Sequence, residues 1–240
     1  MRIHGVILAG GKGTRLRPLT DHMPKPLLRV GKKTMIEYPL MKLVDAGVTT
    51  ITIVRQARYA DEFDSILNDA YPSVTITYAD HPEESYGMPY AINLAKPTVE
   101  KDSSICVLCA DVLFDDSLEL ALNHYRTVPS HAVIIAAEMK DTAGYSHILH
   151  KNNHVNEILP KDAERHLNGI IDLGAAIYPY DVFEKTNLLY PSDTEVPVTD
   201  LNNKFLRENR LQVFKIEGWW SDVGKSIDEY NKVNSRYEYR

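Results

Sequence analysis

Near its amino terminus the chain reads Val6-Ile7-Leu8-Ala9-Gly10-Gly11-Lys12-Gly13-Thr14-Arg15-Leu16-Arg17-Pro18-Leu19-Thr20. The apolar first part predicts a buried β-strand, and the glycines that follow at once let backbone amides approach an anion without obstruction by a Cβ atom. In open α/β sheets, a loop at the carboxyl end of a strand lies where ligands bind. Four cationic side chains follow this strand: Lys12, Arg15, Arg17 and Lys25. The stretch therefore predicts a loop that binds phosphate.

Two well-known phosphate loops do not account for this stretch. A P-loop reads G-x-x-x-x-G-K-[ST], but Gly5 and Gly10 are followed by Gly11 in place of lysine. A dinucleotide fingerprint reads G-x-G-x-x-G, but counting from Gly11 the last position is Leu16. From this stretch alone, a tight strand–helix turn with solvated charges remains an alternative.

Apolar, β-branched runs alternate with helix-like stretches along the chain. The expected strands are residues 3–9, 50–54, 74–78, 105–110, 132–137, 171–178 and 212–216, and the expected helices are residues 35–46, 60–70, 86–95 and 118–125. Such alternation predicts βαβ units. We therefore expect a Rossmann-like, three-layer α/β/α fold with a mostly parallel central sheet. The less regular stretch from about 145 to 168 predicts a small insertion on that sheet.

Composition excludes several classes of protein. The 240 residues carry 44% hydrophobic and 25% charged side chains and a net charge of -6, which are ordinary values for a soluble domain and argue against a nucleic-acid or membrane partner. The apolar run at 6–9 is too short for a signal peptide or a membrane span, so we expect a cytoplasmic protein. Cys106 and Cys109 lie three apart in an expected strand and are interpreted as small buried residues, not a redox pair.

The glycine stretch and the later Pro24-Lys25-Pro26 resemble the signature G-G-x-G-T-R-L-x-P-L-T…P-K-P of the sugar-1-phosphate nucleotidyltransferases, a family that includes glucose-1-phosphate thymidylyltransferases. Further matches extend along the chain at residues 35–40, Gly87, Asp111, 195–200 and 218–224. The resemblance implies transfer of a nucleoside monophosphate from a nucleoside triphosphate to a sugar 1-phosphate, with release of pyrophosphate. It also implies one domain, residues 1–240, with nucleotide bound by about 1–130 and sugar phosphate by about 131–240.

The resemblance assigns roles to particular residues. It makes Arg15, Lys25 and Asp111 catalytic, with Arg15 on the leaving pyrophosphate and Lys25 between the α-phosphate and the attacking oxygen. The implied nucleotide-binding residues are Leu8, Ala9, Gly10, Gly11, Gly13, Thr14, Arg15, His81 and Gly87. The implied sugar-phosphate-binding residues are Tyr145, Lys161, Gly174, Glu195 and Trp220.

The same resemblance places Mg²⁺ on two carboxylates, Asp111 and Asp222. Asp111 follows the apolar run 105–110, so it lies at the carboxyl end of an expected strand. Mg²⁺ commonly takes one or two carboxylates and completes its octahedron with phosphate oxygens and water. An aspartate at the end of a strand also often caps a turn or a helix, and the residue alone does not decide between the two.

Some positions depart from the family pattern. The family's Glu-Lys-Pro segment is replaced by Pro160-Lys161-Asp162, so a glutamate that meets sugar hydroxyls is missing. We therefore expect a sugar other than plain glucose. A glutamine that reads the base in relatives has no clear match near His81, so the base stays open. The alternatives are a guanylyl- or cytidylyltransferase for mannose, heptose or a related sugar phosphate, and a catalytically silent sugar-nucleotide sensor. A homo-oligomer also remains open.

Overall fold

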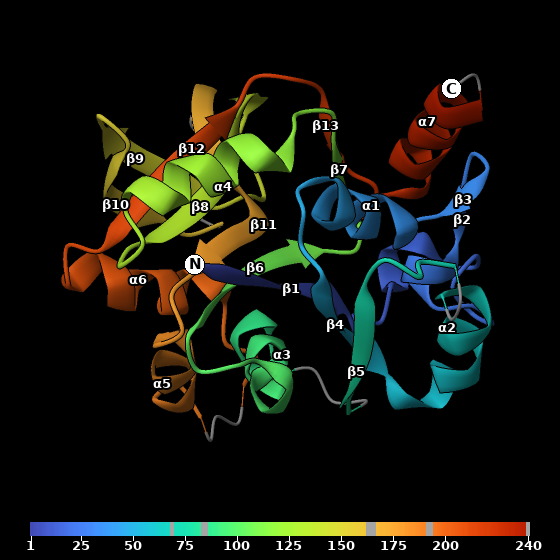
Figure 1. Cartoon of the computed structure of the whole chain (residues 1–240). Helices are drawn as coiled ribbons and strands as arrows, with labels where there is room; N and C mark the ends of the chain where they lie inside the picture. Colours follow the sequence, from blue (N-terminus) through green and yellow to red (C-terminus); the bar gives the residue numbers. More distant parts are fainter. Residues whose placement is uncertain (68–69, 83–85, 162–166, 191–193, 239–240) are drawn as a thin grey trace.

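A computed structural model of the chain describes residues 1–67, 70–82, 86–161, 167–190 and 194–238 (Figure 1). The strands of its main sheet are β1 (Arg2–Ala9), β4 (Thr50–Gln56), β5 (Thr75–His81), β6 (Ser103–Cys109), β8 (Ala132–Asp141), β9 (His147–Lys151), β10 (His154–Leu159), β11 (Leu167–Tyr178) and β12 (Leu211–Ile216). The helices are α1 (Glu37–Asp45), α2 (Ala60–Leu67), α3 (Met88–Leu94), α4 (Leu118–Thr127), α5 (Val182–Asn187), α6 (Val198–Arg207) and α7 (Ile227–Glu238). Each strand and helix expected from the sequence is present, with shifts at the ends, and residues 68 and 69 of the expected helix 60–70 lie outside the described residues.

The main sheet has the strand order β5-β4-β1-β6-β11-β8-β12-β10-β9. The first four strands are parallel to one another. Numbered along the chain, they are the third, second, first and fourth of their group, so the order reverses between β1 and β6. In a doubly wound sheet, ligands bind outside the carboxyl ends of the strands at such a reversal.

The second half of the sheet is mixed, and the expectation of a mostly parallel sheet is wrong there. β11 lies between β6 and β8 and is antiparallel to both. The chain passes from β8 to β11 through the β9–β10 hairpin, and the described residues of this connection, 142–161, contain no helix. Antiparallel neighbours can be joined without a crossover helix, which agrees with the hairpin between β8 and β11.

Helices cover both faces of the sheet (Figure 1). Residues of α1, α2 and α4 pack in one apolar cluster, including Leu40, Phe63 and Leu122. Residues of α3, α5 and α6 pack in a second cluster, including Ile92 and Phe205. The fold is therefore a mixed α/β fold with the sheet between helices. None of the described helices is long and apolar enough to cross a membrane.

Two short pairs of strands lie outside the main sheet. β7 (Val112–Phe114) pairs with β13 (Trp220–Asp222), and β2 (Arg29–Val30) pairs with β3 (Lys33–Thr34). A third apolar cluster joins these pairs to the carboxyl-terminal helix α7 through Val30, Val223 and Val233. The sequence predicted neither pair, because strands of two or three residues are too short to show a periodicity.

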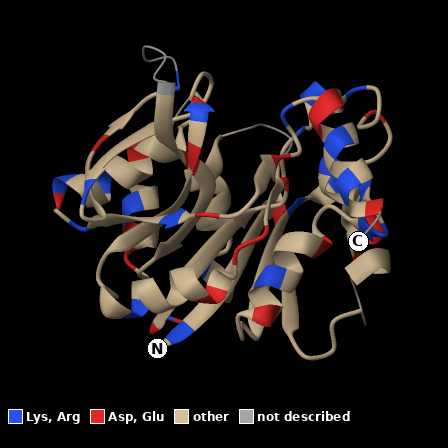
Figure 2. Ribbon diagram, turned by 90° about the horizontal axis from the view of Figure 1, so that it is seen from above, with Lys and Arg blue, Asp and Glu red and all other residues tan. Residues whose placement is uncertain are grey.

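Acidic and basic residues are interspersed along the ribbon in both halves of the molecule (Figure 2). The cations that would hold an anionic substrate must therefore be concentrated locally.

Candidate functional site

The glycine loop opens a cavity of about 220 Å³ beside the point where the order of the parallel strands reverses. The residues that line the cavity are Leu8, Ala9, Gly10, Gly11, Lys12, Lys25, Pro26, His81, Gly87, Met88, Ala91, Cys109, Asp111 and Glu195. Six of the nine residues expected to bind nucleotide thus lie together, from the end of β1 and its glycine loop, the end of β5 and the start of α3, and Asp111 after β6 faces the same cavity. Glu195, expected on the sugar side, faces the same cavity.

Lys25 and Asp111 form an ion pair in this cavity. The ammonium group of Lys25 donates a hydrogen bond to Asp111 Oδ2, and the two side chains are only 13% and 15% exposed. Burial alone would lower the pKa of Lys25, but the charge of Asp111 and this hydrogen bond raise it above its usual value. Burial alone would raise the pKa of Asp111, but Lys25 holds it below its usual value. Both groups are therefore charged at neutral pH.

The β7–β13 pair brings the second carboxylate to the first. Asp222 pairs with Val112 across the two strands, and the Val223 amide donates to the Asp111 carbonyl at 2.9 Å. Burial, and after it the negative charge of Asp111, raises the pKa of Asp222. Two carboxylates that the sequence separates by more than a hundred residues therefore repel each other at the edge of the cavity.

These two carboxylates fit a magnesium ion. Asp222 Oδ1 is buried and accepts no hydrogen bond from any residue that the structure describes. Such an oxygen, next to a like charge, gains from a cation. Across the described residues no group of three or more His, Cys, Asp or Glu side chains is placed to hold a metal by itself. The remaining ligands would be phosphate oxygens and water, as is usual for Mg²⁺.

Gly224 allows the lysine and the carboxylate to meet. A Cβ atom at this position would lie 2.3 Å from Asp111 Oδ2 and 2.9 Å from Lys25 Nζ. The backbone after β13 thus passes against the ion pair at a distance that only glycine permits. The sequence gave no sign that Gly224 touches the other two residues.

Glycines also set the shape of the nucleotide side. A Cβ atom on Gly10 would lie 2.9 Å from the His81 ring, so the ring packs directly on the loop. Gly87 has a φ of +91°, and a Cβ atom there would lie 2.0 Å from the Val196 carbonyl oxygen. Gly13, with a φ of +66°, begins the 3-10 turn Thr14–Leu16. Any larger residue at these places would move the loop or the start of α3.

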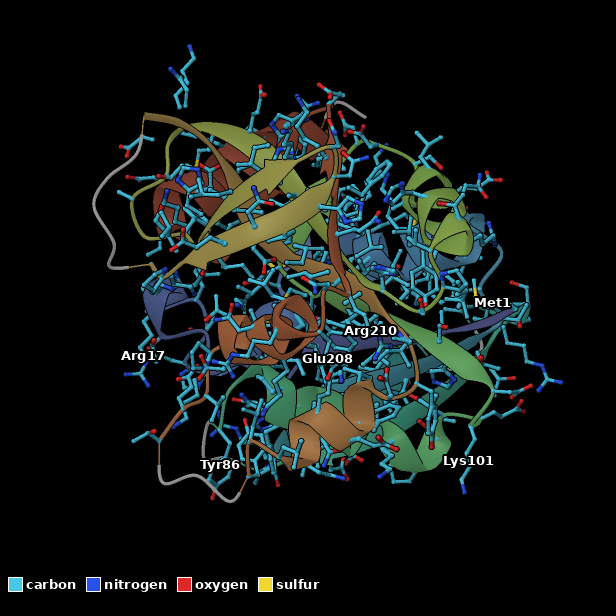
Figure 3. All side chains as sticks on the ribbon, turned by 90° about the vertical axis from the view of Figure 1, so that its left-hand side faces the viewer. Met1, Arg17, Tyr86, Lys101, Glu208 and Arg210 are labelled. Atoms are coloured by element: carbon cyan, nitrogen blue, oxygen red, sulfur yellow. The ribbon has the colours of Figure 1, made fainter. Side chains whose placement is uncertain are left out.

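The four expected cations do not all face the cavity. Lys12 and Lys25 line it. Arg15 is exposed. Its positive charge contributes to the lowered pKa of Asp111 and opposes the rise in the pKa of Asp222. Arg17 has a 67% exposed side chain paired with Asp21 and extends outward from the molecule (Figure 3).

The residues expected on the sugar side lie beside the carboxylates. The rings of Tyr145 and Trp220 meet edge to face with centroids 6.1 Å apart. Burial, and after it the charge of Asp222, raises the pKa of Tyr145 to about 12. Lys225, which the sequence did not single out, lies over the Tyr145 ring at 5.0 Å.

Gly174 and Lys161 lie near a further carboxylate that the sequence did not single out. Gly174 has a φ of +70°, and a Cβ atom there would lie 3.0 Å from Cys109 Sγ. Its amide donates to Asp172, whose pKa burial raises to about 6 while the charge of Lys161 opposes the rise. Lys161 is exposed and is not among the residues that line the cavity. Its neighbour Asp162 lies outside the described residues.

Comparisons with known proteins agree on one family. The model of the family described as nucleotidyl transferase matches residues 4–240. The chain is 32% identical over 230 residues to a mannose-1-phosphate guanyltransferase of Debaryomyces hansenii and 31% identical over 229 residues to the bifunctional protein GlmU of Methanococcus aeolicus. In each case 93% of the chain is matched, but it spans only 62% and 52% of the relatives' lengths.

Solved structures show a similar fold. A Bacillus anthracis protein assigned as a glucose-1-phosphate thymidylyltransferase superposes with a TM-score of 0.89 at 27% identity, over 98% of this chain and 95% of that one. A UDP-glucose pyrophosphorylase with bound UDP-glucose superposes with a TM-score of 0.85 over all of both chains, but at 19% identity it supports the fold alone.

Proposed function

The chain belongs to the nucleotidyl transferase family, and we propose that it transfers a nucleoside monophosphate from a nucleoside triphosphate to a sugar 1-phosphate, releasing pyrophosphate. The observation that carries this proposal is the meeting of Lys25, Asp111 and Asp222 beside the glycine loop. Two anionic substrates must approach each other in this reaction, and the site places a buried ammonium group next to two carboxylates suited to a divalent cation.

In the proposed reaction, an oxygen of the sugar phosphate attacks the α-phosphorus. The bond from that phosphorus to the bridging oxygen of the β-phosphate breaks, and its electron pair leaves with pyrophosphate. The attacking phosphate is already an anion at neutral pH, so no general base is needed. Catalysis then rests on positioning and on neutralisation of charge.

The residues divide these tasks. Lys25 neutralises the α-phosphate and the attacking oxygen, and Arg15 at the exposed mouth meets the leaving pyrophosphate. Amides of the glycine loop face the phosphates, and Tyr145, Gly174 and Trp220 bound the sugar. When bound between Asp111 and Asp222, Mg²⁺ would neutralise the charge on the phosphate oxygens.

The whole chain, residues 1–240, would act as one catalytic domain. The nucleotide would bind to the Rossmann-like parallel strands within residues 1–130, and the sugar phosphate to residues 131–240. The presence of Asp111, Asp222 and Lys25 together disfavours a catalytically silent sensor, because a protein that only binds the sugar nucleotide does not need two carboxylates for a metal ion.

Transfer of guanylate to mannose 1-phosphate is the specific form that the relatives favour, since several of them are mannose-1-phosphate guanyltransferases. It agrees with the loss of the family's glutamate at Pro160, which disfavours plain glucose. A site that leaves one sugar hydroxyl unpaired loses about 1–3 kcal/mol for that group.

The test is pyrophosphate release from the purified protein with a panel of sugar 1-phosphates and the common nucleoside triphosphates. We expect turnover that requires Mg²⁺ and a preference for mannose over glucose 1-phosphate. Asp111→Asn and Asp222→Asn should each remove most of the turnover. Absence of pyrophosphate with every pair would overturn the proposed reaction. Full activity of both variants at limiting Mg²⁺ would overturn the metal assignment.

A further inference from the structure

Gln56, the last residue of β4, connects that strand to the glycine loop. Its side chain is buried, with the residue 5% exposed, and its Nε2 donates to the carbonyl oxygens of Gly10 at 2.9 Å and Gly11 at 3.1 Å. The strand register explains the contact. Ala9 of β1 lies beside Arg55 of β4, so the residues that follow them, Gly10 and Gln56, also come close together.

We propose that Gln56 is a positioning residue, which turns the amides of Gly11 and Lys12 toward the triphosphate. In a planar trans peptide unit, the C=O and N–H groups point in opposite directions. The Gly10 carbonyl shares its peptide unit with the Gly11 amide, and the Gly11 carbonyl shares its unit with the Lys12 amide. Because both carbonyls point to Gln56, both N–H groups point away from it.

The direction away from Gln56 is available to a ligand. Gly10, Gly11 and Lys12 line the cavity that also contains Lys25. In the part of the chain that the structure describes, neither the Gly11 nor the Lys12 amide donates a hydrogen bond to the protein. Successive free amides of this kind form a concave site for an anion.

The amide of Gln56 has only one orientation that fits its neighbours. Arg58 Nε donates to Gln56 Oε1 at 3.1 Å. Arginine has no acceptor, so the oxygen of the amide must face it and the NH₂ group must face the loop. The flipped orientation would place Oε1 against the carbonyl oxygens of Gly10 and Gly11. Arg58 therefore fixes Gln56, and Gln56 fixes the two peptide units.

This inference rests on the proposed function, and its test separates the two. Gln56→Met removes both donors and keeps the approximate volume of the side chain. The matched control is Gln212→Met, because Gln212 is also buried, at 6% exposed, and bonds to His124 from β12, outside the site. Steady-state pyrophosphate release is measured for each protein while one substrate is varied at a time, and thermal unfolding is measured without ligand.

We expect Gln56→Met to lower kcat/KM for the triphosphate by about ten- to a hundredfold, as for the loss of a preorganised donor. Its KM for the sugar phosphate should stay within about twofold of wild type, because the loop amides face only the triphosphate. Gln212→Met should leave both constants unchanged even where it lowers the unfolding temperature. A purely structural role for Gln56 predicts the same kinetic behaviour for the two variants.

A second variant tests the same role without replacing Gln56, in case Gln56→Met does not fold. Arg58→Ala changes an exposed side chain and frees the Gln56 amide to rotate, so it should raise KM for the triphosphate by about two- to fivefold. If wild type releases pyrophosphate, and both Gln56→Met and Arg58→Ala have the wild-type kcat/KM and KM for the triphosphate, the inference is wrong and the proposed function stands. If wild type releases none, the proposed function fails, and the dissociation constant of the triphosphate for each variant still decides the role of Gln56.

Discussion

Two largely buried lysines of this protein are each paired with carboxylates, but their surroundings differ. Lys25 meets Asp111 in the cavity, where Asp222 adds a second negative charge. Lys185, on α5, meets Glu208 at 2.6 Å, on the face of the molecule shown in Figure 3. Both lysine side chains are almost buried, at 13% and 10% exposed. The lysines themselves therefore do not distinguish a catalytic site from a structural one.

The carboxylates do distinguish them. Around Lys185, Arg210 supplies a second cation and bonds to both Asp181 and Glu208, so two cations face two anions. The hydrogen bond from Lys185 lowers the pKa of Glu208. At the site, burial and the nearby Asp111 instead raise the pKa of Asp222. A cluster that is unfavourable until a ligand arrives is typical of a functional site.

The largest expected contrast is in turnover. Lys25→Met should lower kcat by about 10²- to 10³-fold, because one preorganised contact to the developing charge is lost. Lys185→Met removes the same charge from a structural pair and should keep kcat near that of wild type. Pyrophosphate release at saturating substrates measures both. An effect of Lys25→Met confined to KM for the triphosphate would mean that Lys25 anchors only the ground state.

Gly224→Ala should have the next largest effect. The added Cβ atom would lie 2.3 Å from Asp111 Oδ2, so the ion pair must shift. A displacement of about 1 Å at a reacting centre can lower the rate by roughly 10²-fold. Gly218→Ala is a matched control, because Gly218 is exposed and its Cβ atom would lie equally close, at 2.3 Å, to Asp116 Oδ1, a residue that does not line the cavity. Equal kcat for the two variants would contradict the proposed role of Gly224.

Lys185→Met should mainly change stability. It leaves Glu208 without its closest cation, but that carboxylate is 42% exposed and solvent screens the pair, so the free energy of unfolding should fall by only about 1 kcal/mol. Urea denaturation followed by circular dichroism measures the difference. Unchanged stability would show that Arg210 alone holds the two carboxylates.

Asp222→Asn should change stability in the opposite direction. The substitution removes the repulsion between the two carboxylates and should stabilise the metal-free protein at pH 7 by about 0.5–2 kcal/mol. Mg²⁺ should raise the unfolding temperature of wild type more than that of the variant. A less stable variant with an unchanged response to Mg²⁺ would remove Asp222 from the metal site.

The smallest effect concerns pH. The folded-state pKa of Glu208 is lowered, so its ion pair contributes stability above the ordinary glutamate value of about 4.3 and loses it as the pH falls through the folded pKa. The difference in unfolding free energy between wild type and Lys185→Met should therefore shrink between about pH 6 and pH 3. A difference that is constant over this range would mean that Lys185 acts by packing on Phe205, which its ammonium group faces at 4.8 Å.

The first half of the sheet and its loop could be predicted because their signals are local. An apolar run followed by Gly10 and Gly11 indicates both the strand and the place where an anion can approach. Asp111 follows a run of the same kind, and parallel strands bring their carboxyl ends to one edge, so its position on the loop side of the sheet was expected. Its ion pair with Lys25 was not predicted from the pattern. The roles of these residues in catalysis remain predictions.

The second half could not be predicted as well. The antiparallel insertion of β11 between β6 and β8 is a matter of pairing with two other strands, and no pattern within β11 itself indicates it. The pairing of β7 with β13 involves three residues on each strand, which is too few for a periodic signal. Asp172 and Gln56 carry no motif and are distinguished only by what they contact.

By itself, the sequence determined the first strand and the glycine loop with its cations, because glycine conformation and the position of charge along the chain are local properties. The resemblance to the family placed Asp222 with Asp111, but only the tertiary structure decided that the β7–β13 pair brings them together, that Gly224 passes against the ion pair, and that Gln56 bonds to the loop. Each of these depends on a pairing between distant segments, and the energy of such a pairing lies in the contact itself and not in either segment alone.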